Sequence, residues 1–259
     1  MSKYALPAPL GLKLKLSRAR KHLRHLRRVI ERFEASNPYM LHRRVDANGR
    51  YYLYSIQLAE APHLVELLAD EAIHHLRTVL DHLISATVES VGKKVTAKHA
   101  FPIRRKEPKT PKEIADYRAM LKHVPRDART VIYLLQPFHR GADAKSHPLA
   151  ILARLDNRFK HTGLHLLSHQ VECPKVAGII QPPAPAKRGR DSGDVFAKVP
   201  VTVDVQKHFE PYVSVEIAFS MRVTGVRDIN LDTLDSIYNY VRDEVIRKAV
   251  RFKRLPNRL

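Results

Sequence analysis

Polar side chains that can transfer protons or hold anions are concentrated in one segment of this chain, and a shorter group follows later. The first segment places such residues within thirteen positions: Asp70, Glu71, His74, His75, Arg77, Asp81 and His82. The later group comprises Asn157, Lys160 and His161. Histidines and carboxylates can act as general acids and bases, while arginine and lysine can stabilise a developing negative charge. A buried cluster of such groups is costly unless they find partners, so a cluster of this kind would indicate function.

Residues 61–90 are expected to form the helix that positions the first segment. They contain no glycine, and their apolar residues recur at every third or fourth position, as on one face of a helix. That stripe comprises Val65, Ala69, Ala72, Leu76, Val79 and Leu83. The opposite face carries Asp70, His74, Arg77 and Asp81, and the edge beside the stripe carries Glu71, His75, Thr78 and His82.

Residues 149–167 are expected to form the helix that carries the second group, with Pro148 at its start. Asn157 and His161 are four positions apart and therefore point the same way. We expect this helix to set its polar residues against a polar edge of the first helix. An alternative stays open, in which these are ordinary surface pairs and a structural polar network without a ligand.

The charge of the chain favours a polyanionic partner. There are 46 lysines and arginines against 26 aspartates and glutamates, which gives a formal net charge of +20. Nucleic acid, RNA or DNA, would relieve the resulting repulsion, and a membrane surface ranks below it because there is no Trp and the apolar stripe of residues 12–35 is narrow. The candidate nucleic-acid-binding residues are Arg20, Arg24, Arg27, Arg28, Arg43, Arg44, Arg104 and Arg105.

The remaining patterns predict an α+β fold. Residues 12–35 show a helical apolar seam, and Thr110-Pro111 followed by Glu113 is a helix start, so further helices are expected at 113–123, 126–135 and 231–253. Asn48-Gly49 predicts a β-hairpin over residues 39–57 in which both turn positions have positive φ. Strands are also expected at 176–180, 195–205 and 212–220, around a proline-rich loop at 182–193.

These elements suggest a mainly helical bundle with an inserted N-terminal hairpin, then a small antiparallel sheet and a C-terminal helix. Residues 1–170 would hold the bundle and hairpin. Residues 171–259 would hold the sheet and the closing helix, packed on the first part as one unit.

Two segments resemble the hallmark segments of an uncharacterised bacterial protein family that is frequent in actinobacteria. They are His-His-Leu-Arg-Thr-Val-Leu-Asp-His-Leu at 74–83 and Leu-Asp-Asn-Arg-Phe-Lys-His at 155–161. In that family the first reads roughly His-Asn-Leu-Arg-Ser-x-Leu-Asp-His-Leu and the second Leu-x-Asn-x-Asp-Lys-His-Arg. This chain departs from them at His75, Phe159 and Thr162. The family implies no known activity.

A weaker resemblance is to HEPN-type domains, helical bundles that often act as metal-independent RNases. Their signature is an arginine, a polar residue after it and a histidine four to six positions after the arginine, which Arg77, Thr78 and His82 satisfy. The resemblance implies that His82 moves the proton of a ribose 2′-hydroxyl while Arg77 stabilises the phosphate. Five positions along a helix rotate by about 140°, so one copy cannot aim both groups at one phosphate. The family's usual solution is a homodimer whose two motifs share a cleft.

Other chemistry finds little support. The single cysteine, Cys173, excludes an intrachain disulfide and a cysteine-rich zinc site, and there is no glycine-rich phosphate loop. A metal site built from Glu71, His75, His82 and His161 is disfavoured because two ligands two helical turns apart lie roughly 10 Å from each other. We therefore expect no metal and no cofactor. No apolar run is long enough to span a membrane and no signal peptide is evident, so a cytoplasmic location is expected.

The sequence thus predicts a basic protein that contacts RNA or DNA and not a membrane. The candidate catalytic residues are Arg77, Asp81, His82, Asn157, Lys160 and His161. Three hypotheses remain open: a HEPN-like RNA endonuclease that works as a homodimer, a non-catalytic nucleic-acid-binding or accessory protein, and a structural polar network with no ligand.

Overall fold

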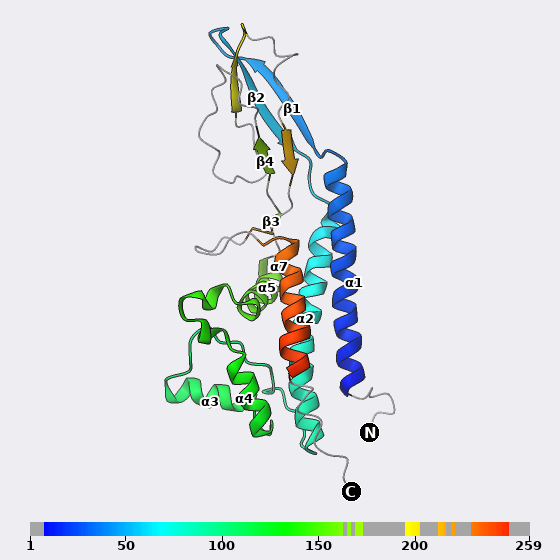
Figure 1. The fold of residues 1–259 in the computed structure, drawn as a ribbon, viewed down its shortest axis with the longest axis vertical. Coiled ribbons are helices and arrows are strands. Elements are labelled where there is room, and N and C mark those ends of the chain that lie inside the picture. Colours follow the sequence, from blue (N-terminus) through cyan, green and yellow to red (C-terminus); the bar gives the residue numbers. More distant parts are fainter. Residues whose placement is uncertain are drawn as a thin grey trace.

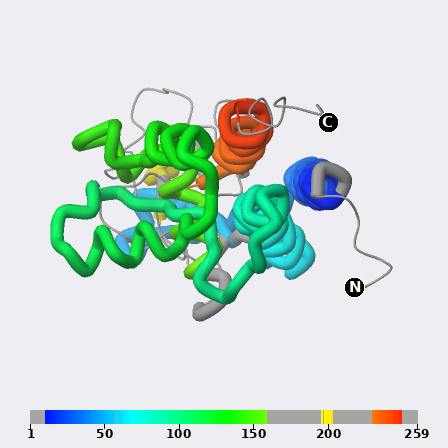
Figure 2. Tube along the Cα trace, turned by 90° about the horizontal axis from the view of Figure 1, so that it is seen from below, coloured from blue at the N-terminus to red at the C-terminus, as the bar shows by residue number. Residues whose placement is uncertain are grey.

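The computed structural model describes residues 8–162, 165–166, 169–172, 195–202, 212–215, 219–220 and 229–248. Over these residues the chain has the mainly helical α+β fold that its sequence predicts. Two helices of 28 residues, α1 (Ala8–Ala35) and α2 (His63–Ser90), run antiparallel along the length of the molecule (Figure 1). A third helix, α7 (Leu231–Asn239), stands beside them (Figure 2). It continues as a π-helical turn, Tyr240–Ile246, where the sequence predicted one continuous helix.

The apolar seams predicted for the first two helices are the surfaces on which they pack. On α1 the buried seam residues are Leu12, Ala19, Leu23, Leu26 and Ile30. The stripe predicted for α2 is buried throughout, and further apolar residues of α2 are buried with it, namely Leu68, Ile73, Leu80, Ile84, Ala86 and Val88. The buried surface of α2 is wide because α1 packs on one side of it and α5 (Pro148–Thr162) on another. A helix that is buried over so much of its circumference is the centre of the core.

The hairpin lies at one end of the long helices. Strand β1 (Tyr39–Val45) pairs antiparallel with β2 (Tyr51–Leu58), as predicted. Its turn differs from the predicted type, because Gly49 has a positive φ of 67° and Asn48 does not. The N–H of Gly49 donates to the carbonyl of Asp46, and the Asp46 carboxylate accepts the N–H groups of Arg50 and Tyr51. The aspartate therefore organises a four-residue turn that needs left-handed backbone only at the glycine.

Among the residues that the structure describes, the strands from the second half of the chain do not form one separate sheet. Strand β5 (Val195–Pro200) pairs with β2 and extends the hairpin to the order β1-β2-β5. Two short pairs complete the strands: β3 (His165–Leu166) with β7 (Phe219–Ser220), and β4 (His169–Glu172) with β6 (Tyr212–Val215). The helix predicted to reach residue 167 therefore ends at Thr162. The strand predicted at 176–180 and the loop at 182–193 lie outside the described residues.

The segment between α2 and α5 forms a lobe on one side of the helices. It contains α3 (Pro111–Met120), α4 (Arg126–Leu134) and a 3-10 segment, Pro137–Lys145, that the sequence did not predict. The predicted capping box at the start of α3 is present, with the Thr110 side chain accepting the N–H of Glu113. Helix α3 ends at Met120, earlier than the predicted residue 123, and His123 itself has a positive φ of 65°. None of the helices in the described ranges has the length and apolarity that a membrane span requires.

Candidate functional site

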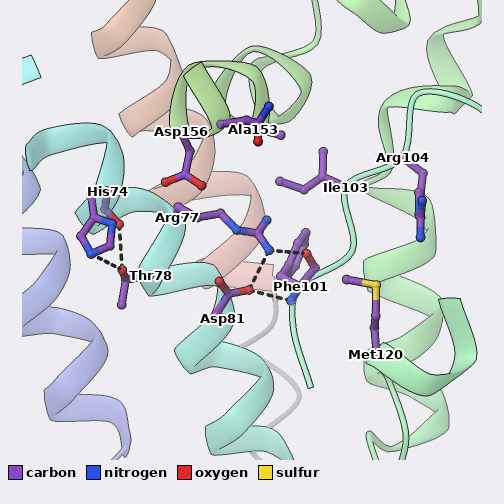
Figure 3. A pocket seen from close by; sticks show the side chains of 11 residues that line it. His74, Arg77, Thr78, Asp81, Phe101, Ile103, Arg104, Met120, Ala153 and Asp156 are labelled. Carbon is purple, nitrogen blue, oxygen red and sulfur yellow. Dashed lines mark hydrogen bonds and ion pairs between the residues drawn. The ribbon is translucent and has the colours of Figure 1, made fainter. Parts of the chain in front are cut away.

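The two polar segments predicted to meet do lie on the same cavity. Residues of α2 and α5 line an open pocket of about 510 Å³, which we call the polar pocket (Figure 3). Its lining residues are His74, Arg77, Thr78, Asp81, Phe101, Ile103, Arg104, Met120, Ala153, Asp156 and Asn157. In Figure 3 the Asp156 carboxylate reaches from α5 toward the side of α2 that carries Arg77, while Ile103 and Met120 lie across the cavity. Three of the predicted catalytic residues are thus brought together: Arg77, Asp81 and Asn157.

Of the three other predicted catalytic residues, the structure describes the side chain of one, His82. His82 is exposed and does not line the polar pocket, because it is five positions after Arg77 and points to another side of α2. The side chains of Lys160 and His161 lie outside the described part of the chain. Sequence reasoning missed Asp156, although it directly precedes Asn157 and faces the same pocket.

Arg77 and Asp81 clamp the chain that follows α2. The Asp81 Oδ1 atom accepts the backbone N–H of Phe101 at 2.9 Å and an Nη2 hydrogen of Arg77 at 2.8 Å. The same Nη2 atom donates to the Phe101 carbonyl at 3.0 Å. Phe101 is completely buried, so the clamp satisfies both polar backbone groups of a residue that has left water. These two side chains therefore hold the wall of the pocket in place.

Gln136 holds the same strip of chain from the other side. Its Nε2 atom donates to the carbonyls of Pro102 at 2.8 Å and Ile132 at 3.0 Å, and its Oε1 atom accepts the N–H of Arg104 at 2.9 Å. The Gln136 side chain is itself buried. Residues 101–104 are thus fixed between α2 and α4, which sets the position of Ile103 and Arg104 at the pocket.

The polar edges of α2 face different neighbours. Burial raises the pKa of Asp70, and the nearby carboxylate of Asp156 raises it further, while His74 opposes both. On the edge toward α1, Glu71 lies 2.8 Å from the Nδ1 atom of His22, whose ring stacks on His75 at 5.3 Å between centroids. Burial lowers the pKa of His75, and the neighbouring His22 lowers it further. The predicted edge of Glu71 and His75 is therefore part of the α1–α2 contact.

A second and larger cavity adjoins the polar pocket. It has a volume of about 1030 Å³ and shares four lining residues with the polar pocket: Ile103, Arg104, Ala153 and Asn157. Its cationic lining residues are Arg104, Arg105, Lys106, Lys145 and Arg154, so we call it the cationic groove. The carboxylate of its lining, Glu113, already accepts the N–H groups of Lys109 and Thr110. Within the described part of the chain, no carboxylate lies at ion-pair distance from any of the five cations.

Arg105 and Arg154 carry like charges in this groove. Burial lowers the pKa of Arg154, and the charge of Arg105 lowers it further. The guanidinium of Arg154 also donates to the Lys145 carbonyl at 3.2 Å. Among the predicted nucleic-acid-binding residues, Arg104 and Arg105 therefore lie in a built cavity, and sequence reasoning missed Lys145 and Arg154, which come from a later part of the chain.

The other predicted nucleic-acid-binding residues are spread over separate surfaces. Arg27 is paired with Asp235 of α7 at 2.6 Å, and the Arg20 guanidinium lies 5.1 Å from the ring centre of Tyr238. On the hairpin, Arg43 lies over the ring of Tyr52 at 4.9 Å. The remaining residues of this set are exposed on α1 and β1: Arg24, Arg28 and Arg44.

Metal ligation has no support among the residues described. They include no group of three or more histidine, cysteine or carboxylate side chains placed to hold a metal ion.

Comparison of the chain with protein-family models, with curated proteins and with solved structures finds no match. The two resemblances noted from the sequence therefore stay predictions.

Proposed function

We propose that this protein binds nucleic acid through the cationic groove, with the sugar–phosphate backbone against Arg104, Arg105, Lys106, Lys145 and Arg154. Cationic side chains without carboxylate partners attract phosphates, and neutralising phosphates releases counterions, which drives the binding. The net charge of +20 supports a polyanionic partner over a single small anion.

The observation that carries the proposal is the gathering of five cations in one cavity, among them Arg105 and the partly buried Arg154, with no carboxylate at ion-pair distance among the described residues. Two guanidinium groups that repel each other, one of them partly removed from water, make a costly arrangement. A phosphate in the groove would offset this repulsion through charge-assisted hydrogen bonds, for which the forked guanidinium is well suited. The groove is therefore a better candidate interface than the single arginines exposed on α1, which face water.

The proposal concerns binding and assigns no cleavage. Arg77 lines the polar pocket and His82 does not, and Arg77 is engaged with Asp81 and Phe101. A HEPN-like reaction would need the shared cleft of two chains that the resemblance implies.

The test reverses charge at two exposed positions of the groove. We expect the variant with Arg105→Glu and Lys106→Glu to bind a short fluorescently labelled RNA or DNA roughly tenfold to a hundredfold more weakly than the unaltered protein. Fluorescence anisotropy across a salt series would measure this, and the slope of log affinity against log salt should become shallower.

A matched control makes the same change of charge on another surface of the protein. The variant with Arg24→Glu and Arg28→Glu on α1 has the same net charge, so it should bind nearly as well as the unaltered protein if the groove is the interface. A larger loss in the α1 variant than in the groove variant would overturn the proposal, as would an affinity that does not respond to salt.

A further inference from the structure

A third cavity lies next to the cationic groove, between α3 and α4. It has a volume of about 500 Å³, within the range of small-molecule sites. Its lining residues are Glu107, Pro108, Ile114, Tyr117, Arg118, Leu121, Arg126, Arg129, Thr130 and Tyr133. Two tyrosine rings and three aliphatic or proline side chains make much of this wall apolar, so we call it the tyrosine pocket.

The tyrosine rings of this pocket are held in defined positions. The hydroxyl of Tyr133 donates to the carboxylate of Glu107, and its ring meets the rings of Phe138 and His139 edge-on at 5.2 and 5.0 Å between centroids. Burial raises the pKa of Tyr117 to about 12, so this residue keeps its O–H at neutral pH. An aromatic wall fixed in this way binds a flat ring without first having to be ordered.

The hydroxyl of Tyr117 is buried, although the side chain of this residue lines the pocket. Its hydroxyl oxygen is sealed from solvent and makes no hydrogen bond to any atom of the described residues. Because water does not reach this oxygen, a ligand in the pocket would contact the ring of Tyr117 and not its hydroxyl.

The tyrosine pocket and the cationic groove lie on two sides of the same short segment. Pro108 lines both cavities, while Lys106 lines the groove and Glu107, the next residue, lines the tyrosine pocket. The first turn of α3 is divided in the same way, with Glu113 on the groove and Ile114 on the pocket. Three arginines of the tyrosine pocket have no carboxylate at ion-pair distance among the described residues: Arg118, Arg126 and Arg129.

We propose that the tyrosine pocket takes one base of a single-stranded nucleic acid whose phosphates lie in the cationic groove. The inference rests on the proposed function and adds a substrate class to it. A cationic channel beside aromatic side chains is the arrangement by which proteins hold single strands, because every unpaired base offers a face for stacking. A base inside a duplex is already stacked and paired and cannot enter the pocket without being pulled out. The protein should therefore prefer single strands to duplexes.

The first experiment compares ligands on the unaltered protein. A labelled single strand should bind roughly tenfold more tightly than the duplex of the same sequence. In a series of strands that each lack one base, loss at a single register should weaken binding by roughly fivefold to a hundredfold, as expected for one lost stacking contact. Equal affinity for strand and duplex, or indifference to every missing base, would overturn the base pocket.

The second experiment tests whether the critical base contacts Tyr133. The variant Tyr133→Leu keeps an apolar side chain but removes the ring. The full strand should bind this variant only as tightly as the strand without the critical base binds the unaltered protein. For this variant, removing the critical base from the strand should cause no further loss of affinity. Two fully additive losses would refute the contact, and thermal melting of the variant verifies that it is folded.

These outcomes separate the two proposals. Charge reversal at Arg105 and Lys106 could weaken binding while single strand, duplex and base-deficient strands bind alike. That outcome would support the cationic groove and refute the base pocket. If no nucleic acid binds the unaltered protein, both fall together.

Discussion

Replacing Asp81 by alanine is expected to lower the free energy of unfolding by about 2 kcal/mol. The carboxylate accepts the N–H of the buried Phe101 and pairs with Arg77, so its removal leaves a buried donor without a partner and a partly buried cation without its counter-charge. Urea denaturation followed by circular dichroism would measure the change.

Asparagine at the same position separates the two contributions. Asp81→Asn retains an oxygen that can accept the Phe101 N–H but removes the negative charge beside Arg77. We expect it to lose about half as much stability as Asp81→Ala. Full stability in Asp81→Ala would contradict the clamp and leave Asp81 available for another role in the polar pocket.

Acidification is expected to destabilise the fold by up to about 3 kcal/mol through one histidine, His147. This residue is 3% exposed, and burial, with a smaller effect from the charge of Arg140, lowers its pKa from 6.5 to about 4. Between these values the unfolded chain binds a proton that the folded chain does not, so stability falls as the pH drops from 6.5 to 4. Below about 4 both states are protonated and no further loss arises from this group.

His147→Asn is the matched control for that pH dependence. The Nδ1 atom of His147 accepts the N–H of Leu149 at the start of α5, and the oxygen of asparagine can accept the same bond. The variant should therefore keep the helix start and lose the titration. Carboxylates also titrate in this range, so the measured quantity is the difference between the two proteins in unfolding free energy near neutral pH and near pH 4. An identical pH dependence in both would show that His147 is not the group responsible.

The structure divides the predicted catalytic set by role. Arg77 and Asp81 hold Phe101, which is the structural role that one of the three hypotheses from the sequence allowed, although the sequence did not identify Phe101 as the partner. Asn157 differs from them, because it lies where the polar pocket and the cationic groove meet. It is therefore placed beside the proposed path of the nucleic acid, while the clamp keeps Ile103 and Arg104 in position.

Local secondary structure could be predicted from the sequence alone. The seams of α1 and α2 follow from apolar residues at helical spacing, and the start of α3 follows from Thr110 and Glu113, which are three positions apart. The hairpin was also predictable, because strand residues flank a glycine that can take a positive φ. Each of these signals depends on residues within a few positions of one another.

Contacts between distant residues were decided only by the tertiary structure. The register that brings Phe101 to Asp81, Arg104 to Gln136 and Arg154 into the same cavity as Arg105 depends on how whole helices pack. Strand β5 joins β2 although most of the chain lies between them, a pairing that no local pattern encodes. Hydrophobic periodicity states which face of a helix is buried, but it does not state which neighbour buries it. The sequence therefore gives the excess of positive charge. Only the tertiary structure shows that some of the cationic side chains line one groove.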